Sequence, residues 1–109
     1  MTEHLHLTAR LWRWTGATNG TWHFVTIDGE PGAQLSSTAL MRRLEGNARG
    51  FGSLKVKARI GGTRFVTSVF PSKAAGLNGQ PGWLLPVKRA VRRAEDLAEG
   101  DAVELFLEF

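Results

Sequence analysis

The residues of this chain best suited to chemistry are four cations that follow Pro86, namely Lys88, Arg89, Arg92 and Arg93. If this segment is helical, all four lie opposite its apolar stripe. Like charges one turn apart cost a few tenths of a kcal/mol, roughly 0.2–0.5 per pair. Cations near a helix N-terminus also oppose the helix dipole. A helix that breaks local rules in this way favours a role in binding an anion.

Other cations extend this hypothesis. Arg42 and Arg43 form a similar pair on a second expected helix, and Lys55, Lys57 and Arg59 alternate along a strand. Together they predict a surface for a polyanion such as a nucleic acid. The alternative is a solvated face whose charges pair with Glu30, Glu104 or Glu108.

Three tryptophans are a second candidate site. If the first hairpin turns near residues 17–18, Trp12 stands opposite His23 and Trp14 opposite Thr21. Trp12, Trp14 and Trp22 then present rings on which a base or a small ligand would stack. The alternative is that these rings fill the interior or cover an open end, as Trp83 would.

The histidines do not predict a metal site. In the same register, His23 pairs six residues away from His6, and therefore about 20 Å from it. This distance excludes shared coordination. His4 is on the same strand as His6, and we expect neither a metal nor another cofactor.

Groups for acid–base or nucleophilic catalysis are sparse. Asp28 and Glu30 lie in a Gly-Pro loop, where acidic residues usually form turns. The spacing suggests no histidine partner for Ser36, Ser37 or Ser72. The sequence therefore predicts a protein that is not an enzyme, with a small hydrolase or isomerase as a remote alternative.

The elements that would position these groups are mostly strands. Leu5–Thr15 alternates apolar and polar residues, and Thr21–Ile27 is rich in aromatic and β-branched residues. Ser53–Phe70 predicts a hairpin in which Gly61-Gly62 supply the positive φ angles of a two-residue turn. A final strand places Val103, Leu105, Leu107 and Phe109 inward.

Two helices interrupt this pattern. One begins at Pro86, with an apolar stripe of Val87, Ala90, Val91, Ala94 and Leu97, and ends at Gly100. The other runs from about Ser37 to Glu45 and would bury Leu40, Met41 and Leu44. Residues 28–35 and 71–82 are expected to be loops at one end of the molecule.

Composition bounds the class of protein. The chain has the length of one domain, no cysteine and a net charge of +4. The absence of cysteine fits a reducing compartment, and the polar N-terminus lacks a signal-peptide pattern, so we expect a cytoplasmic protein. No apolar run is long enough to cross a bilayer, and no membrane association is expected.

The sequence also suggests an internal repeat. A shift of fifty residues aligns Leu35 with Leu85 and Arg42-Arg43 with Arg92-Arg93 without a gap. Gly20-Thr21 and the strand after it resemble Gly62-Thr63 and its strand. We therefore predict half-repeats at about 20–60 and 62–109, related by a pseudo-two-fold axis. Chance similarity between two short amphipathic helices is the alternative.

Several motifs resemble a known family. They are Gly20-Thr21-Trp22, Gly61-Gly62, Thr67–Pro71, Leu84–Ala94 and Glu99–Leu105. The combination resembles a prokaryotic family of domains of unknown function, number nineteen-oh-five. The resemblance implies a double-split β-barrel, the architecture of AbrB-type swapped-hairpin regulators, with both half-barrels fused in one chain. It implies no activity.

We therefore expect a single mainly β domain, a small double-split barrel of about six strands with two short helices. Its function is predicted to be non-catalytic binding of a small ligand or a protein partner, at the end formed by loops 28–35 and 71–82. The alternative is a basic nucleic-acid-binding barrel that uses the four cations after Pro86 with Arg42 and Arg43. A fused pseudo-dimer favours a monomer, with a dimer as the alternative.

Overall fold

The structure is a computed structural model that describes residues 2–15, 20–46, 52–73 and 81–109. In this part of the chain six strands and two helices form a closed barrel with the strand order β1-β2-β5-β4-β3-β6, and every neighbouring pair is antiparallel. The mainly β barrel expected from the sequence is confirmed. The elements are β1 His4–Thr15, β2 Thr21–Ile27, α1 Gly29–Leu44, β3 Leu54–Ile60, β4 Thr63–Ser72, β5 Gly82–Pro86, α2 Arg89–Ala94 and β6 Ala102–Glu108.

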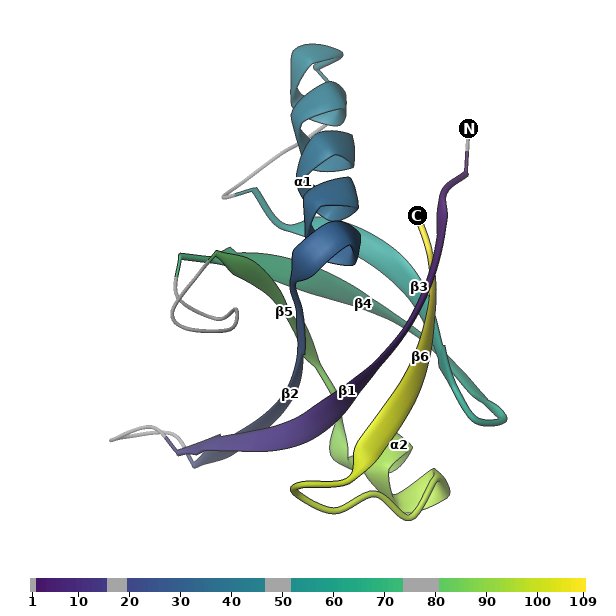
Figure 1. The fold of residues 1–109 in the computed structure, drawn as a ribbon. Helices are drawn as coiled ribbons and strands as arrows, with labels where there is room; N and C mark the ends of the chain where they lie inside the picture. The colour runs from purple at the N-terminus through teal and green to yellow at the C-terminus, as the bar shows by residue number, and fades with distance from the viewer. Residues whose placement is uncertain (1, 16–19, 47–51, 74–80) are drawn as a thin grey trace.

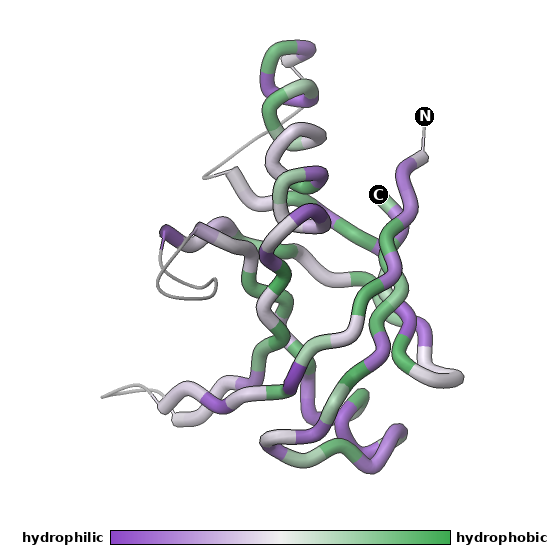
Figure 2. Tube along the Cα trace, viewed as in Figure 1, coloured by the Kyte–Doolittle hydropathy of each residue, from purple (hydrophilic) through white to green (hydrophobic). Residues whose placement is uncertain are grey.

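The barrel interior is filled by alternate residues of the strands, as the period of two requires. In β3 and β6 the alternation is strict, and Figure 2 shows hydrophobic and hydrophilic positions following one another along the strands. The inward side chains predicted for the last strand are buried, which confirms that prediction. The fully buried large side chains are Leu11, Val25, Ile27, Leu35, Val56, Val69, Leu85, Val87, Val103, Leu105 and Leu107.

The hairpin between β3 and β4 is confirmed, with Ile60 opposite Thr63. Of the two glycines in this turn, only Gly61 has a positive φ, of 58°. The expectation that both glycines adopt positive φ was therefore wrong, and one positive residue in the first turn position is the pattern of a type II′ turn.

The register of the first hairpin differs by one residue from the expectation. Trp12 stands opposite Phe24, and Trp14 opposite Trp22, so that His23 pairs with Arg13. A shift of one residue exchanges the two faces of a strand. The expected turn at 17–18 lies outside the described residues.

Helix α1 begins eight residues earlier than expected, so residues 28–35 are not a loop. Asp28 precedes the first turn and Pro31 lies within it, where a missing N–H costs no helical hydrogen bond. The buried face is Gly32, Leu35 and Ala39. The expected buried residues are wrong: the exposed fractions of Leu40, Met41 and Leu44 are 51%, 55% and 73%.

The segment from residue 71 to residue 100 was expected to be a loop followed by a long helix. It contains strand β5 and a shorter helix, α2. Of the expected loop 71–82, Pro71 and Ser72 belong to β4 and Gly82 begins β5, while 74–80 lie outside the described residues. Pro86 ends β5 rather than beginning the helix, and α2 starts only at Arg89. In the expected apolar stripe, Val87 and Val91 are buried but Ala90 and Ala94 are exposed.

The two helices lie at opposite ends of the barrel, as Figure 1 shows. The suggested repeat aligns Leu35 of α1 with Leu85 of β5, which are residues of different elements. The duplication stays a prediction.

Candidate functional site

The barrel wall has an opening beside β4, and its cause lies in the sequence of β5. Among the described residues, β4 pairs with β5 only through Phe70, Pro71 and Ser72. In this register the next residue of β5 whose backbone faces β4 is Pro86, opposite Ser68. Proline has no N–H to donate, so the ladder ends here. Val87 then turns its N–H to the carbonyl oxygen of His23, at 2.9 Å, and the chain leaves the wall to form α2.

A groove of about 880 Å³ fills this opening, a volume in the range of ligand sites. One bank is the outer surface of β4 with Lys55 of β3, and the other is the start of β2 and the segment from Pro86 into α2. We call it the β4–α2 groove. Its lining residues are Thr21, Trp22, His23, Lys55, Val66, Thr67, Ser68, Phe70, Pro86, Val87, Lys88, Arg89 and Arg92.

Four of these lining residues are cations and none is acidic: Lys55, Lys88, Arg89 and Arg92. Within the described residues, Arg13 forms an ion pair with Glu99 and His6 forms a hydrogen bond with Glu104, and neither contact includes a groove cation. The expected pairing of the helix cations with Glu30, Glu104 or Glu108 is therefore absent from the described residues. An unpaired cluster of one sign attracts an anionic partner.

Arg92 is the most constrained of the four cations. Its Nη1 donates a hydrogen bond of 2.6 Å to the carbonyl oxygen of Val87. Burial, with a smaller contribution from the neighbouring Arg89, lowers its pKa below the ordinary value, and a guanidinium remains charged nonetheless. Arg92 therefore holds a fixed positive charge on the side of α2 that faces the groove.

His23 contributes a neutral ring to the same groove. Its Nδ1 is buried and has no hydrogen-bond partner within the described residues. Burial lowers the pKa of His23, the charges of Arg92 and Arg13 lower it further, and Glu99 opposes them. A neutral imidazole has one donor and one acceptor nitrogen, and the buried Nδ1 leaves one of the two without a hydrogen bond among the described residues.

The tryptophans proposed for stacking separate into different environments. Trp22 is half exposed and lines the groove, with Phe24 nearly parallel at 6.1 Å. Trp14 is also half exposed and stands opposite Trp22 on β1. Trp12 packs against Phe24 at 5.2 Å, and its Nε1 donates to Thr26 Oγ1 at 2.9 Å. Trp12 is therefore engaged within the sheet.

The six cations proposed for nucleic-acid binding do not form one surface. Lys88, Arg89 and Arg92 line the groove, and Arg93 is exposed on α2 but is not part of the lining. Arg42 and Arg43 lie in the last turn of α1, at the opposite end of the barrel (Figure 1).

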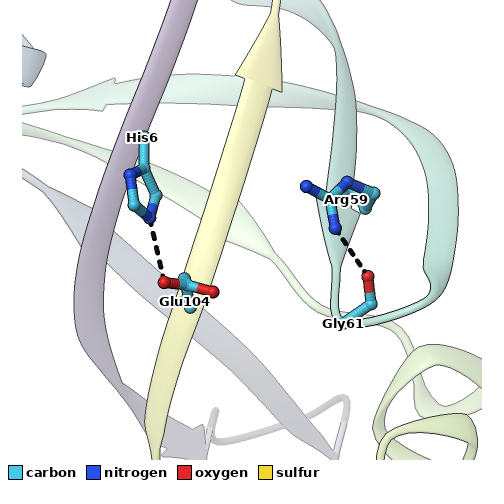
Figure 3. Close-up of polar contacts among 4 residues, drawn as sticks. All are labelled: His6, Arg59, Gly61 and Glu104. Carbon is cyan, nitrogen blue, oxygen red and sulfur yellow. Dashed lines mark hydrogen bonds and ion pairs between the residues drawn. The ribbon is translucent and has the colours of Figure 1, made fainter.

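The remaining strand cations face elsewhere. Lys57 and Arg59 line a separate hollow with Arg64 and Phe106. The guanidinium of Arg59 lies 4.0 Å from the centre of the Phe106 ring, and its Nη1 donates to the carbonyl oxygen of Gly61 at 2.9 Å. Figure 3 shows the hydrogen bond from Arg59 to Gly61 beside the one between His6 and Glu104. Arg59 therefore already has partners within the fold.

A second cavity, of about 600 Å³, lies where the sequence predicted the binding end. It is lined by the first turns of α1, the end of β4 and the start of β5, including Trp83. The Nε1 of Trp83 donates to Ser36 Oγ at 3.0 Å. Lys73 is the only charged residue among the described residues that line it.

No group of three metal-binding side chains exists within the described residues. Neither described helix is long and apolar enough to span a bilayer. The sequence had indicated Trp22 and the α2 cations, but it missed His23, Val66, Ser68 and Phe70 as groove residues. The available signal was Pro86, which follows two leucines of a strand and interrupts its pairing.

The fold and the groove thus define a closed six-stranded barrel with a cationic opening in its wall. The family model described as Domain of unknown function (DUF1905) matches residues 8–107. The chain belongs to this family, as its motifs had indicated. No curated protein matches the chain.

Proposed function

We propose that this protein is a non-catalytic binding module whose β4–α2 groove holds an anionic partner, a small ligand or a segment of another protein. The observation that carries the proposal is four cations that form no ion pair with any described residue, around one groove that also exposes aromatic surface. Lys88 and Arg92 repel each other across one turn of α2, and a bound anion would relieve this repulsion.

The apolar part of the groove indicates more than a simple inorganic anion. The exposed fractions of Trp22, Val66 and Phe70 are 50%, 55% and 45%. Removing such surface from water contributes roughly 25 cal/mol per Å². The best partner therefore combines negative charge with apolar groups.

The groove offers binding groups rather than a catalytic pair. Within the described residues, no hydrogen bond joins His23 to a hydroxyl or a carboxylate, so no nucleophile and base are coupled there. This supports a module that binds without transforming its partner.

Nucleic acid is the second candidate, because Trp22 stands beside three helix cations and would stack on a base. This second hypothesis also includes two further proposals, that the barrel is related to AbrB-type regulators and that its two halves arose by duplication. The distance between Arg42-Arg43 and the groove weighs against a long phosphate track (Figure 1). A single-stranded end would fit better than a duplex.

The test is a binding experiment with defined anions, in which binding is measured by the change in tryptophan fluorescence and in the thermal midpoint of the protein. The probes are a short oligoglutamate, adenosine triphosphate, a single-stranded oligonucleotide and a mixed duplex. The charge-reversal pair Lys88→Glu/Arg89→Glu replaces the two exposed groove cations at the start of α2 and leaves Lys55 of β3 in place. The pair Arg42→Glu/Arg43→Glu makes the same change of net charge at the other end of the barrel.

We expect at least one anion to stabilise the wild-type protein, with an affinity that falls as salt is added. The variant Lys88→Glu/Arg89→Glu should bind that anion at least about tenfold more weakly than the wild type. The affinity of the control variant Arg42→Glu/Arg43→Glu should stay within about twofold of the wild-type value. Unchanged affinity of the groove pair, or no response of the wild type to any of the four probes, would refute the proposal.

A further inference from the structure

One edge of β4 faces the groove and has no partner strand in the part of the chain that the structure describes. In a two-residue hairpin the residues that flank the turn, here Ile60 and Thr63, exchange hydrogen bonds with each other. Alternate residues of β4 therefore bond to β3, and those between them, Val66 and Ser68, turn their N–H and C=O groups away from it. The pairing of Phe70 with Leu84 on the β5 side agrees with this assignment.

The side chains along this edge are not those that usually protect one. Exposed edges are commonly blocked by charges, bulges or prolines. Here Val66 and Phe70 are exposed and apolar, and Ser68 between them is small. At the start of the strand, Glu95 accepts a hydrogen bond from Thr63 Oγ1 at 2.6 Å, which ties α2 to β4. The open edge is therefore bounded by α2 at one end and by β5 at the other.

We propose that the partner is an extended acidic peptide segment, which adds to β4 as a short strand inside the groove. This inference rests on the proposed function and names the class of anion. The peptide backbone would bond to Val66 and Ser68, its apolar side chains would contact Trp22 and Phe70, and its carboxylates would face the groove cations. Strand addition of this kind obtains affinity from the main chain and specificity from alternate side chains.

The charges exclude a second copy of this chain as the preferred occupant. The outward side chains that the β4 edge of a second copy would offer are Arg64, Val66, Ser68 and Phe70. These include no carboxylate, so a second copy would bring a further cation to the groove and leave the groove cations without counter-charges. An acidic segment has the complementary sign. A nucleotide would satisfy the cations, but it would leave the row of backbone groups on β4 unpaired.

The probe is a blocked peptide of about six residues that alternates glutamate and valine, the length of an ordinary strand. Two further peptides carry backbone N-methyl groups on alternate residues, in one frame or in the other. These keep the charge and the side chains but remove the donors on one side of the strand. We expect one frame to bind at least about tenfold more weakly than the parent, and the other to bind nearly as well.

The protein supplies a matched pair of variants. Val66→Pro removes the N–H that faces the groove without breaking a bond to β3, because proline is tolerated where a strand's N–H points outward. Val66→Ala shortens the side chain and keeps that N–H. Val66→Pro should weaken the parent peptide at least about tenfold, and Val66→Ala by about threefold or less. The thermal midpoint verifies that both variants fold.

The outcomes separate this inference from the proposed function. If both N-methylated peptides bind as well as the parent, strand addition is wrong and the cationic groove remains. If adenosine triphosphate or an oligonucleotide binds and the peptide does not, the peptide assignment is wrong and the binding module remains. If no anion binds at all, both fail.

Discussion

Each end of the barrel carries a helix with two consecutive arginines, but the two ends treat their polar groups differently. At the α1 end, Trp83 is buried and its Nε1 bonds to Ser36. Arg42 and Arg43 lie in the last turn of α1, where the helix dipole favours cations. At the α2 end, the Nδ1 of His23 is buried without a partner among the described residues.

The cations of α2 make the same contrast. Lys88 is the N-cap and Arg89 the first residue of the helix, where the dipole disfavours positive charge. No carboxylate of the described residues forms an ion pair with either. The α2 end thus has a buried ring nitrogen without a partner and two cations at a helix N-terminus, whereas among the described residues the α1 end has neither feature. The α2 end is therefore the end that carries the candidate binding site.

The largest effect that tests this contrast is on stability at the α1 end. Trp83→Ala should lower the free energy of unfolding by about 3–5 kcal/mol, because it empties a buried site and leaves Ser36 without its donor. Trp22→Ala should change it by less than about 1 kcal/mol, since that ring is half exposed. Urea denaturation measures both. Comparable losses for the two variants would show that the ends do not differ as described.

A smaller effect tests what holds α2 beside the groove. Glu95→Ala should cost about 1.5 kcal/mol, because the carboxylate accepts the short bond from Thr63 Oγ1 and fits into the space left by Gly61. Glu99→Ala is the control, since its pair with Arg13 is exposed and 3.7 Å long, and it should cost about 0.5 kcal/mol or less. Thermal unfolding compares them, and equal costs would mean that Glu95 does not anchor α2.

The smallest effect is on the pH dependence of stability. The folded state lowers the pKa of His23 below its ordinary value of 6.5, so the unfolded state binds the proton first as the pH falls. The contribution of His23 is therefore present above pH 6.5 and is lost as the pH falls from there through the lowered value.

His23→Gln should make the thermal midpoint less sensitive to pH between about 7.5 and about 5.5 than it is in the wild type. His4→Gln changes an exposed histidine on β1 and serves as the control. A wild-type slope in His23→Gln would remove this ring from the account of the groove.

The sequence was most informative where a local pattern determines the structure. The Gly61-Gly62 turn and the alternation in β3 and β6 each follow from neighbouring residues, and the elements predicted from them are present. Proline and glycine were misleading because they fit several structures. Pro31 and Gly32 suggested a loop but lie in the first turns of α1, and Pro86 suggested a helix start but ends a strand.

The candidate site was harder to predict because its parts are distant in sequence. Trp22, Lys55 and Arg92 come from three elements and meet only through the order in which the strands close the barrel. The register of the first hairpin determines on which face of β2 His23 lies. The observed register differs by one residue from the expected one, and the local sequence pattern does not distinguish between the two.

Pro86 has a consequence for how a partner enters. A gap made by bending or by heat closes again when the strands return, but an imide nitrogen offers no hydrogen in any conformation. The covalent structure of Pro86 therefore excludes a hydrogen bond from its nitrogen to Ser68. The β4 edge is open without any conformational change, and a peptide that binds there need not first break a hydrogen bond of the sheet.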